Sequence, residues 1–327
     1  MTGREIIRRA LAFEDPPRIG FIYDDGRLND TVVAYPDPNP NFDEQRHTTK
    51  DGAERWRDEW GCTWQRLDAF SKGEVAEGPI KEWSDLESYE PPLMLEPERY
   101  EASRRRLAEH PDKYPLAWLR GFPFAIARKL RTFEQYLLDV VAEPENVKRL
   151  NGVVRDVLLK HIELFGDMGC KGVGFGEDWG TQERLLINPA HWRAIFRPDF
   201  EVLCDAAHAR GMTVWMHSCG YIADIIDDLI EIGINLLQFD QPALYGIDFL
   251  AERYGGRVAF WSPVDIQKTL QSGDRTLIRA EAKALVEKLG RGGGFIAKNY
   301  GNLDAINVKP EWDQWAYEAF LEFGGGA

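Results

Sequence analysis

Strand-like and helix-like patterns of hydrophobic residues alternate along most of the chain. Short apolar runs that end in polar residues predict strands, and longer stretches with apolar residues three and four positions apart predict helices. The expected strands cover residues 18–23, 60–67, 114–119, 171–178, 213–219, 235–240, 257–262 and 294–298. The expected helices cover residues 2–14, 97–110, 124–142, 144–168, 189–210, 222–232, 247–254, 274–289 and 310–322. Regular alternation of the two patterns after residue 114 is typical of a parallel sheet flanked by helices.

Right-handed crossovers between parallel strands allow either an open doubly wound sheet or a closed eight-stranded barrel. The sequence contains no phosphate-binding P-loop, and its glycines at 172, 174 and 176 repeat every two residues along a strand instead of opening a helix. We therefore expect an α/β fold with a single (β/α)8 TIM barrel and an N-terminal helical and loop extension. One domain would cover residues 1–327, with 1–113 as a divergent N-terminal part and 114–327 as the barrel core. The Pro-rich residues 30–50 indicate a long loop or lid.

Composition excludes several classes of partner. The 327 residues carry 40 Lys and Arg against 54 Asp and Glu, a net charge of −14, which argues against nucleic acid and anionic membrane surfaces. No apolar run approaches the roughly 20 residues that a membrane span needs, and the N-terminus lacks the apolar core of a signal peptide. The four cysteines have no paired spacing. Reduced thiols in a cytoplasmic protein are therefore expected.

The carboxyl ends of the predicted barrel strands carry polar side chains, and in a parallel barrel these ends meet at one mouth. The polar ends are Tyr23-Asp24-Asp25, Arg120, the run 177–182, the run 217–219, the run 238–241, Trp261-Ser262 and Lys298-Asn299-Tyr300. Successive side chains of a strand point to opposite faces. This alternation predicts a pocket that holds Asp178, His217, Cys219, Gln238 and Asp240.

Alternation also makes predictions for the strand at 171–178. Val173 and Phe175 should face the outer helices, and Gly172, Gly174 and Gly176 should face inward. Glycines on the inner face leave room, as if a ligand approached the backbone.

His217 and Cys219 lie two residues apart at the end of one strand, so both side chains share a face. An imidazole and a thiol in this arrangement can bind one metal ion, and zinc accepts both ligand types. A buried thiol beside a hydrogen-bonded histidine explains the same pair without a metal. Asp178 has an alternative role as a helix cap, and Asp240 has one as a turn residue. Their convergence at one barrel mouth favours a functional site.

Five segments resemble the uroporphyrinogen decarboxylase superfamily in their order and spacing. They are residues 177–182, 217–220, 238–242, 254–257 and 292–295. The element His217-Ser218-Cys219-Gly220 is similar to the cobalamin-linked methyltransferase branch, whose members are (β/α)8 barrels with zinc at the mouth. The resemblance implies zinc as a cofactor, with His217 and Cys219 as its first two ligands. It also implies methyl transfer to or from a corrinoid carried on a separate protein, and a homodimer.

Two departures from the family pattern change the picture. The loop at 298–302, where the branch supplies a third ligand, contains no Cys and no His. Asp178, Glu177 or Asp240 then completes the coordination, or the site holds no zinc. The arginine-rich substrate loop of the decarboxylases is replaced by residues 23–27, which include two acids. An acidic loop would repel a tetrapyrrole that carries many carboxylates, so porphyrinogen decarboxylation is not expected.

These observations predict a zinc-type methyltransferase that moves a methyl group between a small methoxylated or methylated compound and a corrinoid protein. The predicted metal ligands are His217, Cys219 and Asp178, and the predicted catalytic residues are Asp178, His217 and Asp240. The predicted substrate-binding residues are Glu177, Trp179, Gln182, Trp215, Gln238, Gln241, Trp261 and Tyr300. Two alternatives stay open. One is a metal-independent decarboxylase or lyase that acts on a small carboxylate, and the other is a barrel that binds a ligand without catalysis.

Overall fold

A nearly closed barrel of eight strands forms the centre of the protein, and the computed structural model describes residues 1–68 and 71–326. The strands are β1 (Gly20–Ile22), β2 (Thr31–Ala34), β7 (Tyr114–Trp118), β8 (Gly172–Gly176), β9 (Thr213–His217), β10 (Ile234–Gln238), β11 (Ala259–Ser262) and β12 (Phe295–Lys298). Their order is β1-β12-β11-β10-β9-β8-β7-β2, and all of its ladders are parallel. Between β2 and β1, the Asp30 N–H donates to the Phe21 carbonyl at 2.8 Å. The predicted α/β barrel is confirmed.

Helix α1 (Gly3–Ala12) closes the barrel at the amino ends of the strands. Thr2 caps it, since the Thr2 side chain accepts a hydrogen bond from the Glu5 N–H. Ile7 is fully buried and packs with Leu11 into the apolar interior of the barrel. The other members of this interior cluster are Ile22, Tyr114, Leu116, Trp118, Trp215, Leu236, Ala259, Trp261 and Ile296. The barrel therefore has a packed floor, and its mouth lies at the carboxyl ends of the strands.

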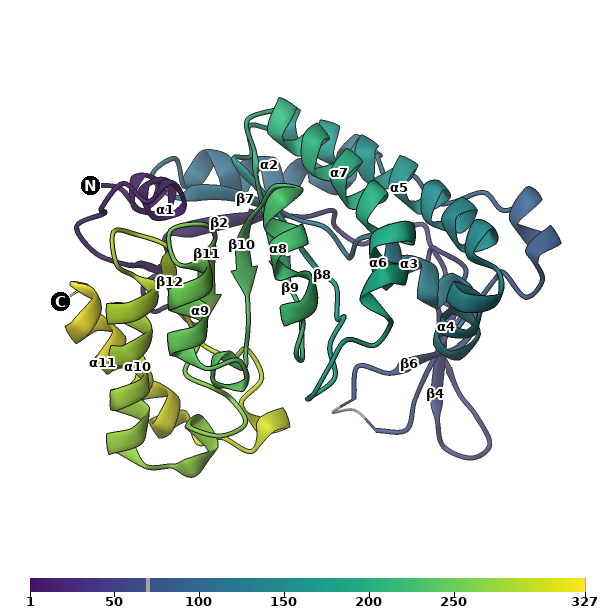
Figure 1. The fold of residues 1–327 in the computed structure, drawn as a ribbon. Helices are drawn as coiled ribbons and strands as arrows, with labels where there is room; N and C mark the ends of the chain where they lie inside the picture. The colour runs from purple at the N-terminus through teal and green to yellow at the C-terminus, as the bar shows by residue number, and fades with distance from the viewer. Residues whose placement is uncertain (69–70, 327) are drawn as a thin grey trace.

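Helices surround the barrel, as Figure 1 shows. They are α3 (Pro123–Leu130), α4 (Phe133–Ala142), α5 (Pro144–Asp167), α6 (Pro189–Ile195), α7 (Arg197–Ala209), α8 (Ala223–Glu231), α9 (Ile247–Tyr254), α10 (Arg275–Leu289) and α11 (Pro310–Gly324). Helix α5 packs beside α7 on one side of the barrel, and α10 packs beside α11 on another. Short 3-10 helices are η1 (Trp83–Glu87), η2 (Pro97–Tyr100), η3 (Pro242–Leu244), η4 (Leu270–Ser272) and η5 (Asp304–Ile306).

Two stretches that were each expected to form one helix form two. Residues 124–142 divide into α3 and α4 at Thr132, whose φ of 67° is incompatible with a right-handed helix. Residues 189–210 divide into α6 and α7 at Phe196. Pro198 lies in the first turn of α7, where its missing N–H costs nothing. In one uninterrupted helix over 189–210, the same proline would remove a backbone hydrogen bond.

A second, four-stranded antiparallel sheet lies in the chain between β2 and β7. Its strands are β3 (His47–Thr48), β4 (Glu54–Arg57), β5 (Thr63–Arg66) and β6 (Glu74–Glu77), and α2 (Glu101–Glu109) follows it. Strand β5 lies within the strand predicted at residues 60–67, and it pairs antiparallel with β4. Figure 1 shows this sheet beyond α4, at one side of the barrel. Strands β1 and β2 precede residue 114, so the barrel sheet draws on the N-terminal third of the chain as well.

Two further observations concern the cysteines and the helices. Cys62, Cys170, Cys204 and Cys219 are all free thiols. Among the helices of residues 1–68 and 71–326, none combines the length and the apolar character that crossing a membrane requires.

Candidate functional site

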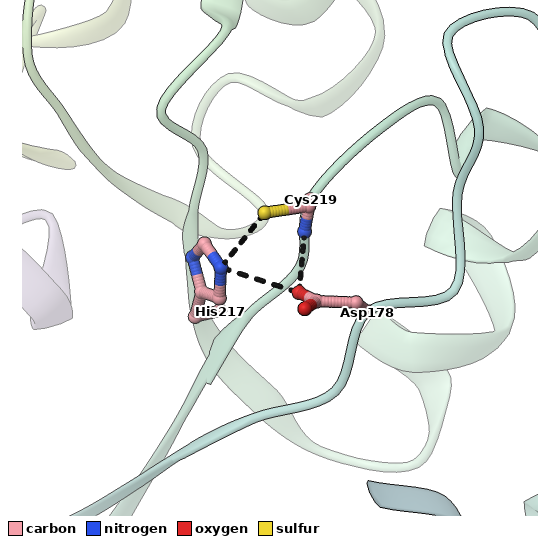
Figure 2. Close-up of side chains that lie close together, drawn as sticks. All are labelled: Asp178, His217 and Cys219. Carbon is pink, nitrogen blue, oxygen red and sulfur yellow. Dashed lines mark hydrogen bonds and ion pairs between the residues drawn. The ribbon is translucent and has the colours of Figure 1, made fainter. Parts of the chain in front are cut away.

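Three potential metal-binding side chains meet at the barrel mouth. His217 is the last residue of β9, Cys219 follows two residues later, and Asp178 lies two residues beyond the end of β8. One donor atom from each side chain lies within 4.8 Å of the other two. The His217 Nε2 atom is 3.3 Å from the Cys219 Sγ atom and 3.3 Å from the Asp178 Oδ1 atom. Figure 2 shows the three side chains pointing toward one another from two neighbouring loops.

Backbone contacts between the two loops hold this arrangement. The Cys219 N–H donates to Asp178 Oδ1 at 2.9 Å, and the Gly180 N–H donates to the Cys219 carbonyl at 3.2 Å. The Tyr221 N–H donates to the Thr181 carbonyl at 2.7 Å. Gly220 has a φ of 73°, and a Cβ atom there would overlap with the backbone of Gly180. The loops can approach this closely because both positions lack a side chain.

A chain of hydrogen bonds fixes the His217 ring from behind. Lys298 Nζ and Gln238 Nε2 both donate to Asp240 Oδ1, each at 2.8 Å. The amide oxygen of Gln238 therefore faces His217 and accepts a hydrogen bond from its Nδ1–H. This tautomer directs the Nε2 atom toward Cys219 and Asp178, which is the usual way in which an outer partner orients a metal-binding histidine. Burial disfavours the charged form of Asp240 and by itself would raise its pKa. The positive charges of Lys298 and His217 outweigh this effect and hold the pKa of Asp240 below the ordinary value.

In the metal-free protein, His217 and Asp178 form an ion pair. Burial disfavours the charged imidazole, but hydrogen bonds to Asp178 and Cys219 outweigh it and raise the pKa of His217 to about 10. Burial likewise opposes the Asp178 carboxylate, and the His217 ring holds its pKa well below the ordinary value. A proton on Nε2 then occupies the position at which this nitrogen would bond to a metal ion.

We expect His217 of the metal-free protein to stay protonated at pH 8 and to titrate near pH 10. Because its folded-state pKa is raised, the stability that it contributes is complete below the unfolded value of about 6.5 and is lost as pH rises through about 10. The measurement is an NMR titration of the imidazole nitrogens. In Asp178→Asn the titration should move to lower pH, and a wild-type titration near the ordinary value would contradict the ion pair.

The donor set fits a zinc ion. Nitrogen, sulfur and oxygen donors from three side chains leave one tetrahedral position open, as in catalytic zinc sites. Among the candidate carboxylates, Asp178 has an oxygen that lies with the His217 and Cys219 donors, whereas Asp240 is bonded to Lys298 and Gln238. Glu177 is fully buried and faces away, where its Oε1 atom accepts a hydrogen bond from the Ala125 N–H in α3 at 3.0 Å.

A cavity of about 210 Å³ reaches the donor cluster at Cys219. Cys219 and Asp240 lie in its wall, and so do three of the predicted substrate-binding residues, Gln182, Gln241 and Tyr300. The remaining wall is formed by Ser218, Gly220, Phe239, Tyr245, Ile266, Gln267 and Ile306. Gln182 and Gln241 are within hydrogen-bonding distance of each other, at 3.3 and 3.4 Å. A wall that combines apolar side chains with a few amides, phenols and a carboxylate is typical of a small-molecule site.

The predicted tryptophan walls are distributed over three places. Trp179 is fully buried on the helix side, where its ring stacks on Phe124 with centroids 3.9 Å apart. Trp215 lies in the barrel interior and stacks on Tyr114. Trp261 packs between Trp215 and the mouth, with Lys298 Nζ 5.1 Å from its ring centroid. Trp215 and Trp261 therefore lie beneath the site, whereas Trp179 and Glu177 are not brought to it.

The inner-face glycines of β8 do not all open onto free space. A Cβ atom on Gly174 would lie 2.5 Å from the Trp118 ring, and one on Gly172 would meet Leu116 and Tyr114 at 3.1 Å. Protein side chains therefore take up the room that was expected for a ligand. Only at Gly176, beside His217, would a Cβ meet nothing closer than 3.6 Å. Val173 and Phe175 face the outer layer as predicted, and Phe175 stacks on Phe122.

Lys298 is the site residue that sequence reasoning left without a role. It stands at the carboxyl end of β12, in the position from which barrel strands supply functional side chains. That position was the signal that could have identified it. The contact with Asp240 joins the last strand of the barrel to β9 through Gln238.

The family model described as Uroporphyrinogen decarboxylase (URO-D) matches residues 69–301. This match spans more than half of the chain, so the protein belongs to the URO-D family. The family resemblance expected from the sequence is confirmed. Comparison with curated proteins gives no match.

Solved structures with a similar fold include a methyltransferase from Methanosarcina mazei. Its TM-score is 0.65 at 18% identity, over 81% of this chain and 76% of that chain. D-allulose 3-epimerase from Methylomonas sp. has a TM-score of 0.44 at 15% identity, over 70% of this chain and 83% of that one. For 3-keto-D-glucoside 4-epimerase from E. coli, the TM-score is 0.44 at 14% identity, over 77% of this chain and 97% of that chain. The first likeness confirms the fold, and the other two are too weak to support an argument.

Proposed function

We propose that this protein is a zinc-type methyltransferase that moves a methyl group between a small methylated compound and a corrinoid. The observation that carries the proposal is the Asp178, His217 and Cys219 cluster at the barrel mouth, with its donor atoms within 4.8 Å of one another. The fold of the Methanosarcina mazei methyltransferase and membership in the URO-D family support it. A bound Zn²⁺ would supply Lewis-acid activation of the methyl donor or acceptor.

The residues of the site have separable roles in this proposal. His217, Cys219 and Asp178 would hold the metal. Gln238, Asp240 and Lys298 orient the His217 ring, since each is hydrogen-bonded to the next. Gln182, Gln241 and Tyr300, in the cavity wall, would bind and orient the substrate. Asp240, fixed by Lys298, would keep negative charge beside the site.

The size of the cavity limits the substrate. About 210 Å³ admits a small methoxylated or methylated compound and is far too small for a corrinoid. The corrinoid would therefore be carried by a separate protein that docks over the barrel mouth.

We also propose a homodimer. The aromatic side chains of α11 are only partly buried against the core of their own barrel; they are Trp312, Trp315 and Tyr317. Light scattering would measure whether the protein is a dimer.

The experiment that tests the function supplies zinc-loaded protein with free cob(I)alamin and a panel of small methoxylated and methylated compounds. Formation of methylcobalamin, followed by its absorbance, is the expected result for at least one compound. Asp178→Asn should transfer the methyl group at least roughly a hundredfold more slowly, since loss of a charged, positioned group at a catalytic centre has effects of this size.

A different outcome would favour the metal-independent alternative. If no compound methylates cob(I)alamin and the chelator-treated protein releases CO2 from a small carboxylate, then Asp178 and His217 act as an acid–base pair. Their contact at 3.3 Å is compatible with proton exchange in that case.

A further inference from the structure

A second cavity, of about 320 Å³, lies between the four-stranded sheet and the helix α3. None of its wall residues belongs to the cavity beside the metal donors. Three tryptophans and three cationic side chains stand out in the wall. They are Trp56, Trp60 and Trp64, and Lys72, Arg120 and Lys129. The other wall residues are Glu44, Asp58, Glu59, Cys62, Met94 and Ile126.

The acidic groups of this wall are already engaged by protein partners. Glu59 accepts two hydrogen bonds of 2.7 Å from the Arg99 guanidinium. Asp58 accepts from the Trp64 Nε1–H at 2.6 Å and from the Cys62 N–H at 2.9 Å. Glu44 pairs with Arg46 at 2.9 Å. Glu59 and Glu44 are therefore each paired with an arginine outside the wall, whereas Asp58 is held by two neutral N–H donors and keeps its negative charge near Lys129.

The cations of the wall lack such partners. Within the part of the chain that the structure describes, Lys72, Arg120 and Lys129 make no side-chain hydrogen bond and no ion pair. Lys129 is the most constrained of the three, because it is half-buried on α3 with its Nζ atom 5.3 Å from the Trp64 ring centroid. Burial holds the pKa of Lys129 below its ordinary value. A sheltered ammonium without a hydrogen-bond acceptor is costly, and a bound anion would remove that cost.

The tryptophans form a rigid wall with flat faces. Trp56 of β4 and Trp64 of β5 are a cross-strand pair, with centroids 6.0 Å apart and planes 11° from parallel. The hydrogen bond from Trp64 to Asp58 fixes its ring. Trp60 lies in the connection between these strands. Such aromatic faces favour a planar ring as ligand.

From these features we propose that the second cavity is a binding site for an aromatic carboxylate, whose ring lies against the tryptophans and whose carboxylate meets Lys129 and Arg120. Arg120 stands at the carboxyl end of β7, so the site adjoins the barrel mouth. A smaller cavity shares Trp60, Met94, Arg120 and Ile126 with it and reaches Trp118, whose ring packs on Trp261 at 6.3 Å. The site therefore lies beside the reaction centre without including the three metal donors.

The test uses benzoate as the probe, with isothermal titration calorimetry on the metal-free protein. Benzoate should bind, whereas neutral benzyl alcohol and non-aromatic cyclohexanecarboxylate should each bind at least tenfold more weakly, because each lacks one of the two recognised features. Lys129→Met and Arg120→Gln should each weaken benzoate binding by roughly tenfold to a hundredfold, the loss expected for a hydrogen bond to a charged group. Trp64→Leu should weaken it as well.

Lys160→Met is the matched control, because Lys160 is exposed on α5 and lies outside both cavities. It should leave benzoate affinity unchanged. The proposal is overturned if millimolar benzoate does not bind, if benzyl alcohol binds equally well, or if Lys129→Met binds like wild type. Cys219→Ala should bind benzoate normally. Loss of benzoate binding in that variant would place the probe at the metal donors instead, and would overturn the separate site without touching the proposed methyl transfer.

Discussion

The Cys219→Ala protein is expected to lose its zinc. Wild-type protein should contain about one zinc per chain if the three donors form a site of the catalytic type. Structural zinc sites with four protein ligands are worth about 10–16 kcal/mol, so one ligand accounts for a few kcal/mol and its removal for roughly a hundredfold or more in affinity. Cys219 is exposed and supplies the one sulfur donor of the cluster, so alanine leaves its fold unstrained. Elemental analysis of both proteins measures the result.

Cys62→Ala is the control for this variant. Cys62 is a buried thiol in the wall of the second cavity, where burial raises its pKa far above the ordinary value, and it belongs to no donor cluster among the described residues. Its removal should leave the zinc content unchanged. Equal zinc in wild type and Cys219→Ala would contradict the donor set. If neither protein contains zinc after zinc supplementation, the result would favour the metal-independent alternative, in which Asp178 and His217 act as an acid–base pair.

Gly220→Ala is expected to damage both stability and the metal site. A positive φ of 73° costs an alanine about 1–2 kcal/mol. The added Cβ would also overlap with the Gly180 backbone, and relieving such overpacking costs roughly 1–3 kcal/mol more. The two terms together predict a fall in Tm of roughly 3–7 °C for a chain of this size. Separation of the two loops would also move Asp178 away from His217 and weaken zinc binding. Thermal unfolding and a zinc titration measure the two effects.

Two other glycines separate the contributions. Gly211 has a φ of 67°, and a Cβ atom added there would have nothing within 4 Å, so Gly211→Ala should show the conformational cost alone, about 1 kcal/mol. Gly152 lies inside α5 with ordinary space around it, so Gly152→Ala should stabilise the protein by about 0.4–1 kcal/mol. A Gly220→Ala protein no less stable than Gly211→Ala would show that the loops separate at no cost.

Sequence periodicity was sufficient to predict the barrel and the meeting of the three donors. Strand alternation assigns side chains to a face, and the strand ends of a parallel barrel converge by geometry. For this reason Asp178 reaches His217, as expected. The same alternation places Glu177 and Trp179 on the outer face with Val173, and the structure buries both of them there. Their proximity to Asp178 in the sequence was misleading.

Other features depend on contacts between distant segments, which one sequence does not reveal. The space on the inner face of β8 is filled by Trp118 from the neighbouring strand, and nothing in the local pattern indicates this. Of the four-stranded sheet, only the strand at residues 60–67 was predicted. Strands β3 and β6 are short and mostly exposed, so their hydrophobic signal is weak. The role of Lys298 depends on its contact with Asp240, 58 residues away.

The packed floor under the metal donors determines how molecules can come and go. Because α1 seals the far end of the barrel, the mouth is the entrance and also the exit. A small methylated compound would then have to enter the cavity before the corrinoid protein covers the mouth. The methyl group would pass directly between the two while both are bound, and the small product could leave only after the corrinoid protein dissociates. Steady-state kinetics would register this compulsory order of binding as double-reciprocal lines that intersect.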